Sequence, residues 1–298
     1  MTVWILLAVS LSGFLAQLIG GTIGMAFGIT SSTGLLILGF SPAVASSAVH
    51  FVEVGTSLLN GTFHARARNV DWRVVLTIGV PGAIGAFIGA VLLSNLNLSF
   101  SKPWTAGLLL ILGIVIIWRF IQPQLALASG RAHAGWLAPL GLGAGFIDAT
   151  AGGGWGIITT SSLMASNKLE PSRAVGTTST ARFLTAVAGS LGFLLALGSE
   201  GIAWGVVIAM LVGCLIAAPI AARLVRVVPR RGLGLATGVA VVVLNVRQMT
   251  ASIGADLPTV LVAMVSALAL ALIPVVWFVS RQRRSAVPSE GQAQSQRR

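Results

Sequence analysis

Five polar side chains recur along one face of an apolar stretch, residues 43–63. They are Ser46, His50, Glu53, Ser57 and Asn60. Their spacing of four, three, four and three residues places all five on one side of a helix. Such a face is very unfavourable in lipid, so it must line a cavity or a polar interface. The carboxyl group of Glu53 and the imidazole of His50 are titratable, which makes both residues candidates for proton coupling.

An arginine lies near the middle of another apolar stretch, residues 174–198. A guanidinium presents a planar fork of N–H donors that matches an oxyanion. Thr178 and Ser179, about one helical turn before Arg182, add hydroxyl donors. We therefore expect these three residues to bind a small anionic substrate.

The third candidate is the phrase GFIDATAGGGWG, residues 145–156, which contains Gly152, Gly153 and Gly154. Glycine is a poor helix former, so three in succession predict a break in a membrane helix. Non-helical backbone survives in a bilayer only inside protein or against water. The N–H groups that start the next short helix favour an anion, and we assign the three glycines to the substrate site.

The two remaining candidates in this phrase each have two interpretations. Asp148 can cap the broken helix by accepting backbone N–H groups, or it can serve as a further proton-coupling site. Trp155, directly after the glycines, can act as a gate or as a packing wedge.

The phrase GFLAQLIGGTIG, residues 13–24, is a weaker copy of the same pattern. Gly20 and Gly21 are expected to supply a second broken end to the substrate site. Helix packing is the alternative for this glycine spacing, and we favour it for Gly85-x-x-x-Gly89.

These candidates are positioned by two similar halves of the chain. Long apolar runs cover 3–21, 43–63, 73–96, 104–121, 135–152, 174–198, 202–222, 232–248 and 258–280, and shorter ones cover 29–40 and 155–166. Pro42 and Ala45 recur as Pro171 and Ala174, and Glu53 corresponds to Arg182. Because equivalent positions of inverted repeats lie across a midplane axis, Glu53 and Arg182 are expected to approach each other.

We therefore predict an all-α, polytopic transmembrane helical fold of two inverted-topology repeats with broken glycine-rich helices and about 9–11 membrane segments. The predicted domains are repeats at 1–121 and 135–250, a cytoplasmic linker at 122–134, an additional transmembrane helix at 251–280 and a basic cytoplasmic tail at 281–298. The basic loops fall on one side, which predicts a multi-pass protein of the cell membrane with a cytoplasmic C-terminus.

The composition excludes several classes of protein. The chain of 298 residues is 55% hydrophobic and 9% charged, too few charges for a soluble domain of this length. The net charge is +12, and the basic residues that produce it lie in short loops and in the tail, beside membrane spans. This location favours contact with membrane lipid over nucleic acid. One cysteine excludes disulfides within the chain and clustered thiolate sites, and we expect neither a metal nor a cofactor.

The segment GFIDATAGGGWGIITTSSLMASNKLEPSRAVGTT resembles the second-half signature of the TauE/SafE sulfite-exporter family, also called the TSUP permeases. The matching features are Gly-Gly-Gly-Trp-Gly and Pro-x-x-Ala-x-Gly-Thr, whereas the first half has GGTIGMAFGITSS where a denser glycine phrase is usual. The resemblance implies secondary transport of small anions such as sulfite or organic sulfonates.

The predicted function is secondary transport of small sulfur-containing oxyanions or organic acids, coupled to protons or another gradient by alternating access. Glu53 and Arg182 have two other interpretations: a structural ion pair, or cation coordination by Glu53 with Asp148. An anion channel is the main functional alternative, followed by a membrane-embedded enzyme and a metal cation transporter. The expected partners are a small anion and lipid, and a homodimer is left open.

Overall fold

The computed structural model describes residues 1–122, 134–166, 169–224 and 227–285. These residues form helices and no strand, which confirms the all-α prediction. The predicted linker at 122–134 lies outside the described residues except at its two ends, and so does most of the predicted tail at 281–298.

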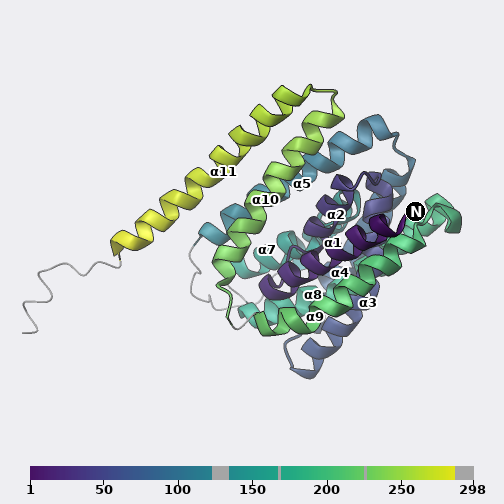
Figure 1. Cartoon of the computed structure of the whole chain (residues 1–298). Coiled ribbons are helices and arrows are strands. Elements are labelled where there is room, and N and C mark those ends of the chain that lie inside the picture. The colour runs from purple at the N-terminus through teal and green to yellow at the C-terminus, as the bar shows by residue number, and fades with distance from the viewer. Residues whose placement is uncertain (123–133, 167–168, 225–226, 286–298) are drawn as a thin grey trace, which may run out of the picture.

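The helices match the predicted apolar runs closely. The first half contains α1 (Val3–Ile23), α2 (Phe27–Ile37), α3 (Pro42–Arg66), α4 (Trp72–Asn95) and α5 (Leu98–Ile121). The second half contains α6 (Ala134–Ala151), the short π-helix η1 (Gly156–Thr160) continuing into α7 (Ser161–Ala165), α8 (Pro171–Gly201), α9 (Trp204–Leu224) and α10 (Arg230–Ser252). The chain then adds α11 (Leu257–Ser285), which lies beside α10 at the edge of the bundle (Figure 1).

Local sequence explains where the long helices begin. Ser41 caps α3 by accepting a hydrogen bond from the Val44 amide at 3.4 Å, and Pro42 occupies the first helical turn. Asp71 caps α4 in the same way, accepting from the Val74 amide at 3.2 Å. Each cap satisfies an N–H group that has no partner within its own helix.

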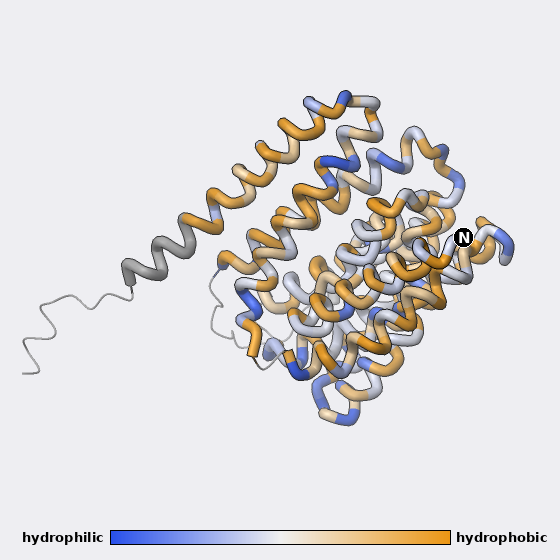
Figure 2. The backbone as a smooth tube through the Cα atoms, viewed as in Figure 1, coloured by the Kyte–Doolittle hydropathy of each residue, from blue (hydrophilic) through white to orange (hydrophobic). Residues whose placement is uncertain are grey.

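The described chain is a multi-pass membrane protein. Seven of its helices are long and apolar enough to cross a bilayer: α1, α4, α5, α8, α9, α10 and, over Leu257–Val276, α11. Helix α3 is not among them because its polar stripe lowers its hydropathy. Ser46, His50, Glu53 and Ser57 of that stripe are buried inside the bundle, whereas Asn60 is exposed near the end of the helix. Figure 2 shows mostly hydrophobic helices with hydrophilic residues gathered in the loops at their ends.

Helices α1 and α9 run parallel and pack closely. Gly13 of α1 faces Met210 of α9, and further along the same pair Gly21 faces Ala221. The missing side chains let the two backbones approach.

The symmetry-related pair is α6 and α4, which also run parallel. Gly85 faces Leu142, and one turn later Gly89 faces Phe146. The predicted packing role of Gly85 and Gly89 is therefore what the structure shows. Since α1 corresponds to α6 and α4 to α9, each half supplies one partner to each pair.

Two further contacts join equivalent helices in opposite directions. In the α3–α8 pair, Gly61 faces Thr180 and Gly189 faces His50, so the two helices are antiparallel. Helices α5 and α10 pack antiparallel in the same manner. Antiparallel packing of equivalent helices is what a two-fold axis in the membrane plane produces, and it defines an inverted repeat.

Candidate functional site

Both halves interrupt their first helix with left-handed backbone. Between α1 and α2, Gly24 has φ 84° and Ala26 has φ 77°; between α6 and η1, Gly152 has φ 73° and Gly154 has φ 144°. Glycine adopts these angles without steric strain, whereas Ala26 does so at a cost of about 1–2 kcal/mol.

The first break lies later than the glycine phrase predicts. Gly20 and Gly21 belong to the continuous helix α1, and the left-handed turn begins at Gly24. Gly20 instead allows Phe27, at the start of α2, to pack against α1. The correction has a simple reason: glycines that permit close packing and glycines that permit a turn look alike in a sequence.

The two breaks contact each other through their backbones. A Cβ atom on Gly28 would lie 2.8 Å from the Cα atom of Gly153 and 3.3 Å from Oε1 of Glu53. A Cβ atom on Gly156 would lie 3.6 Å from the Cα atom of Met25. The starts of both short helices therefore meet near one point, and a side chain at Gly28 would separate them.

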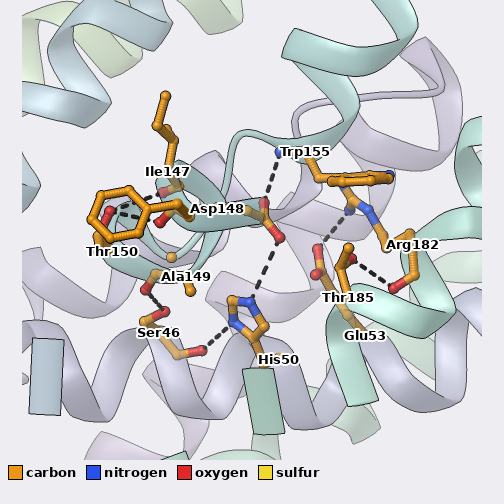
Figure 3. A network of polar contacts seen from close by, with 12 residues as sticks. Ser46, His50, Glu53, Ile147, Asp148, Ala149, Thr150, Trp155, Arg182 and Thr185 are labelled. Atoms are coloured by element: carbon orange, nitrogen blue, oxygen red, sulfur yellow. Dashed lines mark hydrogen bonds and ion pairs between the residues drawn. The ribbon is translucent and has the colours of Figure 1, made fainter. Parts of the chain in front are cut away.

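Glu53 and Arg182 form an ion pair at this point. Nη1 of Arg182 donates to Oε1 of Glu53 at 2.6 Å, across 129 residues of sequence. The Glu53 side chain is 1% exposed and that of Arg182 is 14% exposed, so solvent reaches the arginine alone. The predicted approach of these two residues is present in the structure (Figure 3).

The second guanidinium nitrogen of Arg182 points to the second break. Nη2 lies 3.0 Å from where a Cβ atom of Gly156 would be. Glycine at this position gives the guanidinium room beside the start of η1. Gly156 was not among the predicted site residues, although its place directly after Trp155 identifies it as the first residue of the short helix.

Asp148 caps the second break. Its Oδ1 accepts a hydrogen bond from the backbone N–H of Trp155 at 2.7 Å, and its backbone carbonyl accepts from Gly153 at 2.9 Å. One carboxylate oxygen of Asp148 thus caps the broken helix, as one of the two interpretations of this residue predicted. The other oxygen, Oδ2, faces His50 (Figure 3).

Trp155 is fully buried beside the break. Its indole N–H donates to the carbonyl of Thr178 at 2.9 Å. Its ring lies over Gly82 of α4, where a Cβ atom would come within 2.5 Å of it. The side chain thus wedges the break between α4 and α8 in this conformation.

The predicted hydroxyl donors lie along α8 beside Arg182. Thr178 shares a hydrogen bond of 2.7 Å with the hydroxyl of Thr160 and also donates to the carbonyl of Ala174 at 2.9 Å. Ser179 lines the adjacent cavity and is half-buried. Thr160 is an additional polar residue of the site, and the hydroxyl-rich run TTSS after the break was its sequence signal.

His50 lies on the other side of the broken segment. Its Nδ1 contacts the carbonyl of Ser46 at 2.9 Å, and its Nε2 lies 3.6 Å from Oδ2 of Asp148. The ring packs edge-on against Phe193 with centroids 5.6 Å apart. His50 and Asp148 are both 0% exposed, so this pair is sealed from solvent.

A cavity of about 1100 Å³ leads to Arg182 from one end of the bundle. Its lining includes Trp155, Gly156, Thr178, Ser179 and Arg182, together with Gly20 and Gly21. The mouth lies where α3 and α5 end and where α8 and α10 begin, and we call this side the basic face. Among the described lining residues, Arg119, Arg182, Arg230 and Arg231 are basic and Glu170 is acidic. Such a wall attracts anions.

The fold and this site define a class: a multi-pass membrane transporter built as an inverted repeat, with its broken helices meeting beneath a one-sided cavity. The chain belongs to the sulfite exporter TauE/SafE family, whose profile matches residues 9–248. The resemblance that the glycine phrase indicated is therefore confirmed.

Two curated relatives support this class. The chain is 42% identical over 240 residues to "Probable membrane transporter protein YtnM" of Bacillus subtilis (strain 168), covering 80% of each chain. It is 28% identical over 230 residues to "Probable membrane transporter protein YdhB" of the same organism, covering 76% of this chain and 91% of the relative. These names describe membrane transporters rather than enzymes. No solved structure matches the chain.

Proposed function

We propose that this protein is a secondary transporter of small sulfur-containing oxyanions or organic acids, with Arg182 as the principal substrate ligand. The observation that carries the proposal is the position of the Arg182 guanidinium. Glu53 occupies one of its nitrogens, the other points to Gly156, and the side chain lies at the end of a cavity whose charged lining residues are arginines with the single exception of Glu170 among the described residues. An oxyanion there gains charge-assisted hydrogen bonds in a partly dehydrated place.

Glu53 is the internal competitor of the substrate. It is a buried carboxylate already bound to the arginine, so an anion arriving at Arg182 encounters like charge on Glu53. Protonation of Glu53 removes that repulsion and releases Nη1. Anion binding is therefore favoured by protons, which is one way to link transport to a proton gradient. The same ion pair makes Glu53 a poor ligand for a metal cation.

The inverted repeat suggests how the substrate site becomes accessible from each face of the membrane in turn. In this conformation the cavity reaches Arg182 from the basic face, while His50 and Asp148, across the broken segment, are 0% exposed. Exchange of conformation between the two repeats would open the same site to the other face. By the distribution of basic loops, the basic face is cytoplasmic, the C-terminus lies there, and the membrane is the cell membrane.

The test is a thermal-shift screen of the detergent-solubilised protein against sulfite, sulfate, thiosulfate and alkylsulfonates, followed by flux measurements in proteoliposomes. A ligand that binds the folded state raises the melting temperature as its concentration increases. We expect stabilisation by at least one sulfur oxyanion and saturable flux that follows a proton gradient. Chloride and acetate at equal ionic strength are the controls. Stabilisation by no sulfur compound in the series would reject the substrate class.

A channel is the main alternative, and the structure offers one observation against it. Arg182 is reached from one face, whereas a conducting pore needs a path open through the protein. Flux that rises linearly with substrate and ignores an opposing proton gradient would favour the channel.

A further inference from the structure

A second titratable pair lies across the broken segment from Arg182. Nε2 of His50 and Oδ2 of Asp148 are 3.6 Å apart, and both side chains are 0% exposed. Among the described residues, neither atom has a hydrogen-bond partner. The other polar atom of each residue is engaged: Nδ1 of His50 contacts the Ser46 carbonyl, and Oδ1 of Asp148 accepts from Trp155.

These contacts determine where hydrogen atoms can be. A carbonyl oxygen only accepts, so Nδ1 of His50 must donate to Ser46. A neutral His50 then directs the lone pair of Nε2 at the carboxylate of Asp148. Two buried acceptors would face each other with no hydrogen between them, which is unfavourable. One proton in the gap, on either atom, resolves the conflict.

The charged surroundings of this pair are few among the described residues. Glu53 lies one turn beyond His50 on α3, and Arg182 faces both from α8. These two bind each other, so their charges largely cancel at His50. The remaining contact from α8 is apolar, through Gly189 and the ring of Phe193. One proton added between His50 and Asp148 therefore acts on their contact without being balanced by another nearby charge.

The inverted repeat indicates from which side this pair is reached. Glu53 and Arg182 are equivalent positions 129 residues apart, and the same separation relates His50 to Ser179. Ser179 lines the cavity that is open to the basic face, whereas His50 is buried.

The residues that cover His50 show the same correspondence. Gly189 and Phe193 of α8 pack on His50, and they are equivalent to Asn60 and His64 of α3. Asn60 and His64 line the open cavity. By this symmetry, His50 would line the equivalent cavity if the bundle opened to the opposite face.

We propose that His50 and Asp148 form a proton-binding site, and that closing the face opposite the basic one requires one proton taken up from that face. This inference rests on the alternation in the proposed function. A proton leaves water and forms one N–H or O–H bond, and no other bond changes. In the conformation in which this face is closed, the protein holds one proton more than in the conformation in which it is open. Low pH on that face therefore favours closure.

The experiment uses the labelling rate of a single introduced cysteine to measure how often the face opposite the basic one is open. Val49 is equivalent to Thr178, which lines the open cavity, and Val49 is itself 0% exposed. Cys214, the native thiol, is buried and is replaced by alanine. In right-side-out membrane vesicles, Val49→Cys is treated with a membrane-impermeant thiol reagent at about pH 6 and about pH 8, a range in which histidine titrates. Ser199→Cys, exposed in the last turn of α8 at the same face, corrects for the pH dependence of thiol reactivity.

We expect the corrected labelling rate of Val49→Cys to fall as the pH falls, by at most about tenfold per pH unit for one proton. Asp148→Asn keeps an oxygen for the Trp155 amide and places an N–H group opposite His50. In that background, labelling should be slow and independent of pH. His50→Gln supplies an N–H from the other side of the gap and serves as the second variant.

Each result decides something specific. Labelling that ignores pH in the parent, or still follows pH in both Asp148→Asn and His50→Gln, overturns the proton site while the transport proposal stands. Absence of labelling at every pH, together with absence of sulfur-oxyanion flux, overturns the alternation and the proton site together.

Discussion

Glu53 and Arg182 occupy equivalent positions in two oppositely oriented repeats, and their side chains meet at 2.6 Å. An inverted repeat brings equivalent residues together only close to its two-fold axis. The ion pair therefore marks that axis, and the two broken helices meet at the same place. Charge, non-helical backbone and a cavity coincide there, and the following predictions concern this region.

Replacing Arg182 by alanine should weaken the binding of a sulfur oxyanion by about 100-fold or more, because the charged donor is lost and Glu53 remains unpaired. Isothermal titration or thermal shift in detergent measures this loss. Arg119→Gln, in the cavity wall farther from the break, is the matched control and should retain most of the affinity. Since unpaired Glu53 can destabilise the protein, the double variant Arg182→Gln with Glu53→Gln tests binding in a neutral site. Strong binding by that double variant contradicts the role of the arginine.

Replacing Glu53 by glutamine should tighten anion binding near pH 8 and make the affinity independent of pH. The amide cannot compete as an anion for Arg182, so no proton is needed to release the guanidinium. Binding of thiosulfate or an alkylsulfonate measures this, because the charge of each probe does not change over the pH range studied. If the affinity of Glu53→Gln still rises on acidification as in the parent, another group controls binding.

Adding a methyl group at Gly145 should destabilise the protein by about 1–3 kcal/mol, because the new Cβ atom would overlap the backbone of Gly82 in the α4–α6 contact. Gly143, two residues earlier on the same helix, has nothing within 4 Å of a Cβ position. Gly143→Ala should therefore leave stability unchanged or raise it slightly. Unfolding in mixed micelles measures both variants, and equal stabilities would contradict the close packing of α4 on α6.

Neutralising Arg230 and Arg231 together should raise the apparent KM for anion uptake from the basic face several-fold and leave the maximal rate unchanged. These residues line the mouth of the cavity, so they act on the local anion concentration rather than on the bound substrate. The effect should shrink as ionic strength rises, because salt screens exposed charges. Flux in oriented vesicles at two ionic strengths tests this. A fall in the maximal rate without a change in KM would place these arginines in another step.

Several features of the site were predictable because they follow from local physical chemistry. A polar stripe on an apolar helix must avoid lipid, and three consecutive glycines cannot continue a stable helix. These constraints correctly indicated that α3 is internal and that a break occurs at 152–154. The matched positions of Glu53 and Arg182 indicated their approach for the same reason of repeat symmetry.

Other features depended on packing. Gly20 and Gly21 lie inside α1 and the first turn begins at Gly24, because contact with Phe27 and Ala221 explains the earlier glycines. The pairing of His50 with Asp148 joins residues from different repeats across a helix crossing. No spacing within the sequence specifies such a distance.

The sequence alone determined that this chain crosses a membrane, that it is doubled, and that each half carries a glycine-rich interruption and a charged residue deep in a span. Those properties follow from transfer free energies and backbone propensities, which act residue by residue. Only the tertiary structure decided that the arginine faces an open cavity while the histidine is sealed. Positions related by the repeat are equivalent in the sequence, and only the packing of whole helices decides which of them is exposed.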